Sequence, residues 1–61
     1  MIYKLVIPNG ECDFRFVVGE AYADTEVNKI KFIKDHYEIT LDNGNIIDIV
    51  GNSTILVFRK P

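Results

Sequence analysis

Apolar and polar residues alternate along residues 29–50, which predicts three β-strands joined by two tight turns. The Asp-Asn-Gly segment at 42–44 is the clearest turn signal, because glycine adopts positive φ without steric cost. A three-residue loop there places Ile39 opposite Ile47 and gathers the apolar side chains of both strands on one face. A two-residue loop would pair Ile39 with Asp48, so the pattern favours the longer loop.

The strand before this hairpin extends the same apolar face. A two-residue turn at 34–35 aligns two apolar pairs: Phe32 with Tyr37, and Ile30 with Ile39. The same register sets Lys31 opposite Glu38 on the other face, an opposite-charge pair that contributes about 0.2–1 kcal/mol. Because two hairpins agree on one apolar face, this register is the firmest structural prediction from the sequence.

Residues 2–7 and 12–18 are rich in β-branched and aromatic side chains and predict two more strands. A three-residue Pro-Asn-Gly loop between them would place Leu5 opposite Asp13. A four-residue loop instead aligns two apolar pairs: Leu5 with Phe14, and Tyr3 with Phe16. We predict the four-residue loop, because it keeps the apolar residues on one face.

Residues 19–28 lack alternation and predict a connector, either a long loop or a single helical turn. The segment is acidic, and Tyr22 lies at its centre between Glu20 and Asp24. Loops often carry binding sites, so these three residues form a candidate small-molecule site. The alternative, which we favour, is a solvated connector whose tyrosine caps one end of the core.

The last predicted strand covers residues 54–59, after a turn at 51–53 that sends Leu56 and Phe58 to the core face. The sequence therefore predicts an all-β fold with one small domain over residues 1–61. We expect a small antiparallel barrel or strongly curved sheet of about six strands, SH3-like in scale, with a meander over the last four strands. Such an architecture implies no particular function.

Composition narrows the class of protein. A hydrophobic content of 48% is enough for a core and argues against disorder. No apolar run approaches the roughly 18 residues of a membrane span, and no signal peptide is visible, so we expect a cytoplasmic protein. The start at Met1 and the charged tail at 59–61 are those expected of a whole small gene product, and frequent Ile, Asn, Lys and Tyr indicate a low-GC bacterial or phage genome.

Residues that carry chemistry are sparse. Zinc sites need several Cys or His ligands at short spacing, whereas this chain has one of each, Cys12 and His36, on different predicted strands. The same pair lacks an orienting third group for nucleophilic catalysis. Each glycine lies at a turn, which leaves no phosphate-binding loop. We therefore predict no enzyme, no metal site and no cofactor.

Several apolar residues remain outside the predicted core: Ile2, Val6, Val17, Ile33, Ile46, Val50, Ile55 and Val57. No predicted helix covers them, so either sheet curvature and the 19–28 segment hide them or a partner does. A chain this short, with no disulfide, often gains stability by oligomerising. We expect a non-enzymatic protein-interaction module that self-associates through five of these residues: Ile33, Ile46, Val50, Ile55 and Val57.

The alternative function is a small nucleic-acid-binding barrel. A lysine stripe on the third predicted strand, with the basic C-terminal end, supplies the contacts: Lys29, Lys31, Lys34 and Arg59. The net charge of −2 and the inward direction predicted for Phe32 and Tyr37 count against it. Exposed edge strands offer a further route to a partner, through backbone pairing.

Overall fold

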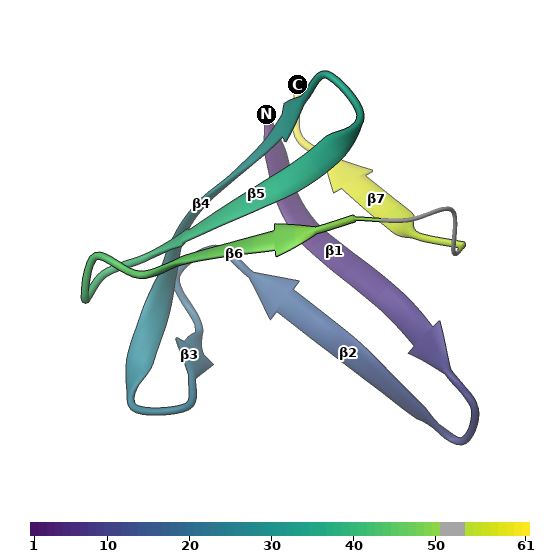
Figure 1. Ribbon diagram of the computed structural model, residues 1–61, viewed down its shortest axis with the longest axis horizontal. Helices are drawn as coiled ribbons and strands as arrows, with labels where there is room; N and C mark the ends of the chain where they lie inside the picture. The colour runs from purple at the N-terminus through teal and green to yellow at the C-terminus, as the bar shows by residue number, and fades with distance from the viewer. Residues whose placement is uncertain (51–53) are drawn as a thin grey trace.

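The chain folds into two antiparallel β-sheets in a computed structural model that describes residues 1–50 and 54–61. The predicted turn at 51–53 lies outside the described residues. One sheet has the strand order β2-β1-β7, and the other has the order β3-β4-β5-β6 and curls into a half-barrel (Figure 1). The strands are β1 (Ile2–Asn9), β2 (Cys12–Val17), β3 (Ala21–Tyr22), β4 (Thr25–Ile33), β5 (His36–Leu41), β6 (Ile46–Ile49) and β7 (Leu56–Arg59). The prediction of a small all-β fold with a curved sheet is confirmed.

The two central hairpins have the predicted registers. Ile39 lies opposite Ile30 on β4 and opposite Ile47 on β6. The backbone N–H of Leu41 donates to the carbonyl of Asn45 over 2.9 Å, which closes a three-residue loop around Gly44 at φ +93°. Turn geometry and side-chain alternation therefore fixed this part of the fold together.

The first hairpin has a different register from the predicted one. Leu5 pairs with Phe16 rather than Phe14, because β1 and β2 are joined by a two-residue loop that begins at Gly10 with φ +63°. A slip of two residues leaves every side chain on the same face, so apolar alternation does not distinguish the two registers. Pro8 is tolerated inside β1 because the β7 partner strand reaches only as far as Val6.

The segment 19–28 is neither a long loop nor a helical turn, which corrects the prediction. It holds β3, a tight turn and the start of β4, with Tyr22 opposite Thr25. Two backbone hydrogen bonds then join the end of β2 to β4: Gly19 N–H to the Val27 carbonyl at 2.9 Å, and Val27 N–H to the Glu20 carbonyl at 3.0 Å. This segment is therefore the corner at which the chain passes from one sheet to the other.

The final strand also departs from the prediction, because β7 pairs with β1 and not with β6. The meander therefore runs through β3, β4, β5 and β6 and leaves β7 out. Leu5 of β1 lies opposite Val57, so Val57 faces the core while Leu56 and Phe58 face outward. The chain ends lie side by side (Figure 1), where the N-terminal ammonium donates to the Lys60 carbonyl over 2.8 Å.

Buried side chains from both sheets form the core: Ile2, Leu5, Phe16, Val27, Ile30, Ile39 and Leu41. Two residues expected outside the core, Ile2 and Val6, are in fact buried. The β1–β7 register shifts between Ile2 and Lys4, and Ile2 turns inward. Val6 lies on β1, the middle strand of its sheet, between Arg15 of β2 and Leu56 of β7. Four residues expected in the core are instead exposed: Phe14, Phe32, Leu56 and Phe58.

No helix in the described part of the chain has the length and hydrophobicity needed to cross a membrane.

Candidate functional site

The five residues of the predicted interface do not form one exposed patch. Ile46 and Val50 are 56% and 75% exposed, at the edge strand β6 and just after it. Ile55 and Val57 instead pack against the core from the other sheet, and Ile33 is half-buried. The residues of β7 that point to either side of the sheet are apolar. Alternation alone therefore did not indicate which side of β7 packs against the core.

A different apolar surface lies on the outer side of the β2-β1-β7 sheet. Leu56 and Phe58 are 47% and 37% exposed there, and the register places them opposite Val6 and Lys4 of β1. Residues directly opposite in a sheet point to the same side. We name this surface the Phe58 face and define it by Lys4, Val6, Arg15, Val17, Leu56 and Phe58.

Two cations flank a pair of aromatic rings at one end of the Phe58 face. The Lys4 ammonium lies 4.9 Å from the centroid of the Phe58 ring, within cation–π range. The Phe58 ring makes an edge-on contact with Tyr3 at 6.3 Å, and the Lys60 ammonium lies 5.0 Å from the Tyr3 ring. This end of the face therefore presents aromatic surface and positive charge together.

The predicted lysine stripe is divided and sits beside acidic groups. Lys29 and Lys31 lie on the outer side of β4, where Lys31 is opposite Glu38 as predicted. Lys34 is in the β4–β5 turn with φ +56°, and Arg59 belongs to the other sheet, opposite Ile2. The four cations are not gathered on one surface, and the pairing of Lys31 with Glu38 makes the outer side of β4 and β5 a solvated surface of mixed charge.

The predicted loop site around Tyr22 does not form a pocket, because residues 1–50 and 54–61 enclose no cavity. The Tyr22 ring lies 5.2 Å from the ring of Phe16, a core residue, and is partly exposed. Glu20 and Asp24 are exposed beside the two-stranded ladder of β3 and β4. This geometry favours the alternative role, in which the tyrosine covers one end of the core.

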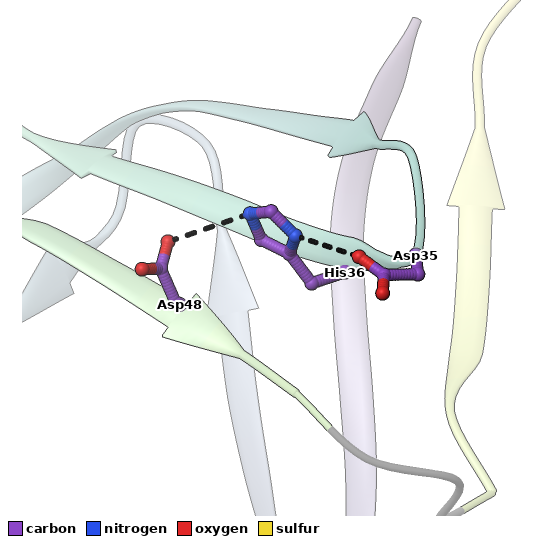
Figure 2. A network of polar contacts seen from close by, with 3 residues as sticks. All are labelled: Asp35, His36 and Asp48. Carbon is purple, nitrogen blue, oxygen red and sulfur yellow. Dashed lines mark hydrogen bonds and ion pairs between the residues drawn. The ribbon is translucent and has the colours of Figure 1, made fainter.

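A polar cluster that the sequence analysis did not identify lies on the outer side of β5 and β6 (Figure 2). His36 Nδ1 is 3.2 Å from Asp35 Oδ1, and His36 Nε2 is 3.8 Å from Asp48 Oδ1. Glu38 stands directly opposite Asp48, and one donor atom from each of His36, Glu38 and Asp48 lies within 4.8 Å of the others. The signal was present in the predicted register, which already set Glu38 against Asp48.

Cys12, the other residue considered for chemistry, is an exposed free thiol at the start of β2 and is not part of this cluster.

Comparison with protein-family models, curated proteins and solved structures finds no match to the chain. The structure thus defines an all-β protein of two antiparallel sheets, with an apolar and aromatic face on one sheet and a histidine–carboxylate cluster on the other. Its function has to be argued from those two surfaces.

Proposed function

We propose that this protein is a non-enzymatic protein-interaction module that self-associates through the Phe58 face. The observation that carries the proposal is the exposure of Leu56 and Phe58, 47% and 37%, on the outer side of a sheet whose inner side already packs in the core. An apolar face beside Val6 and Val17 and flanked by Lys4 and Arg15 has the composition of an interface centre with a charged rim.

The energetics of a short chain favour such an assembly. The accessible surface is 4437 Å², whereas size scaling gives about 4,000 Å² for a monomer of this mass. Fully burying a large apolar side chain contributes about 1.5–3 kcal/mol, so covering two half-exposed ones in each copy is a substantial gain for a small protein. Self-association through the Phe58 face would remove from water apolar surface that the monomer leaves exposed.

The position of β7 supplies a second contribution. This strand lies at the edge of its sheet, paired only with β1. Edge strands present backbone donors and acceptors that another strand can use. Two copies related by a two-fold axis could pair β7 with β7 and bring Leu56 and Phe58 of both copies onto one continuous face.

Leu56→Lys is expected to weaken self-association by at least about ten-fold, because a lysine at the centre of the contact has to lose its hydration. Light scattering after size exclusion, over a range of protein concentrations, measures the change. The wild-type mass should exceed 7.0 kDa and rise with concentration, and the variant should stay at 7.0 kDa.

Ile46→Lys is the matched control, because Ile46 is an aliphatic residue of similar exposure on an edge strand of the other sheet. It should assemble like the wild type, and circular dichroism should show the same fold for both variants. A wild type that remains monomeric at every concentration, or equal loss of assembly in both variants, would refute self-association through this face.

Single-stranded nucleic acid is a second candidate ligand of the same face, favoured by its two cation–aromatic contacts. Lys4 over Phe58 and Lys60 over Tyr3 combine the groups that stack bases and contact phosphates. Arg15 adds a third cation on the sheet surface. These residues replace the predicted lysine stripe, in which Lys31 lies opposite Glu38 and Arg59 belongs to the other sheet.

This candidate predicts salt-sensitive binding of a labelled oligothymidylate, measured by fluorescence anisotropy. Lys4→Glu should weaken binding at least about ten-fold at low salt, because it removes a phosphate contact and adds repulsion. Lys29→Glu, a matched change on the other sheet, should have little effect. Leu56→Lys separates the two functions, since it adds a cation to the face while it opposes self-association. Absence of salt-dependent binding removes the candidate.

A further inference from the structure

We propose that the outer side of the β4-β5-β6 sheet binds a divalent transition-metal ion of the zinc class through His36, Glu38 and Asp48, of which Figure 2 shows His36 and Asp48. The site lies on the sheet opposite to the one that carries the Phe58 face. A negative result for one proposal therefore does not contradict the other.

Strand geometry brings the three side chains to one place. His36 and Glu38 are two residues apart on β5, so they project from the same side of the sheet. Asp48 lies directly opposite Glu38 on β6 and diagonal to His36. A pair of adjacent antiparallel strands thus supplies three ligands within the spacing of neighbouring side chains.

The separations of the donor atoms fit a metal site in which the ligand atoms move closer together when the ion binds. One atom from each side chain lies within 4.8 Å of the other two. In a tetrahedral zinc site with bonds near 2.0–2.2 Å, the ligand atoms lie about 3.4 Å apart. Asp48 is more than half exposed, so rotation of its side chain can supply the difference without moving either strand.

Asp35 orients the imidazole for this role. Its Oδ1 lies 3.2 Å from His36 Nδ1, and a proton on Nδ1 would leave Nε2, which faces Asp48 (Figure 2), free to bind a metal ion. In zinc sites, a metal-binding histidine commonly donates its other ring N–H to a carboxylate.

The donor set selects the class of ion. One imidazole nitrogen with two carboxylates suits zinc and its transition-metal neighbours, whereas calcium and magnesium prefer oxygen ligands alone. Glu38 faces Lys31 in the register, yet no ion pair joins these two side chains in the structure of residues 1–50 and 54–61. The Lys31 ammonium is therefore not held on the Glu38 carboxylate, where it would compete with the metal.

Metal binding would have a structural consequence. β6 is the edge strand of its sheet and has four residues, and it is held on one side only, by β5. A metal ion held by two ligands from β5 and one from β6 would link the edge strand β6 to β5. Small proteins with a limited core often use a metal in this way.

The test is a zinc titration of the full chain in a Cys12→Ser background, because the exposed thiol of Cys12 is itself a zinc ligand. Calorimetry should give one zinc per chain and a raised melting temperature. His36 is the single histidine, so its ring signals in NMR spectra report directly on coordination at Nε2. Magnesium under the same conditions should not move them.

Variants separate the proposed site from incidental binding. His36→Gln and Asp48→Asn should each weaken zinc binding at least about ten-fold, and Asp35→Asn, which acts through the imidazole, should weaken it about 10–100-fold. Asp24→Asn, an exposed carboxylate in another turn, is the control and should keep the wild-type affinity. An unchanged affinity in Asp48→Asn, no zinc-induced shift of the His36 ring, or no binding would overturn the proposal.

Discussion

Ile39→Ala is expected to lower the free energy of unfolding by about 2–5 kcal/mol, which is much of the roughly 3–9 kcal/mol expected for a chain of this length. Ile39 is 0% exposed and lies between Ile30 and Ile47 at the centre of the curled sheet. Truncation removes three buried carbons and leaves a cavity that paired strands on both sides prevent from closing. Urea denaturation followed by circular dichroism, at a concentration below assembly, measures the loss.

Ile46→Ala is the matched control for that measurement. It makes the same substitution on β6, where the side chain is 56% exposed, and should change stability by no more than about 0.5 kcal/mol. Equal losses in the two variants would mean that Ile39 does not lie at the centre of the core.

Val57→Asp should cost on the order of 3 kcal/mol, because it places a carboxylate against the core opposite Leu5. Thermal melting should show a much lower transition or none. Leu56→Asp, one residue earlier on the outer side of β7, should leave the fold largely intact. The contrast tests the orientation of β7, since the register predicted from the sequence would reverse the two outcomes.

Alternation within a local hairpin was informative because the turn limits the choice of register. In the β4-β5-β6 meander, both turns and the apolar faces agreed, and the pairing of Ile39 with Ile30 and Ile47 followed. The same register implies the candidate metal cluster, because it sets Glu38 opposite Asp48 and two residues from His36. The spacing of Cys12 and His36 gives no sign of it, whereas carboxylates opposite one another beside a histidine in a predicted sheet do.

The alternation of apolar and polar residues was less informative where two strand registers are consistent with it. The β1–β2 hairpin slipped by two residues from its predicted register, and both registers set apolar residues opposite Leu5. Residues 19–28 hold the two-residue strand β3 and only the first four residues of β4, which are too few to show a period. Phe14 and Phe32 have the alternation of core residues, yet both are exposed.

The sequence by itself determined that this protein is all-β, that its central strands form a curved meander, and which residues share a face there. Those properties depend on contacts between chain neighbours, which turns and alternation specify. Only the tertiary structure decided that β7 pairs with β1, that Ile2 turns inward, and that Leu56 and Phe58 face outward. β7 is apolar on both sides, so its orientation depends on which side the opposing sheet covers, and that is a property of the whole fold.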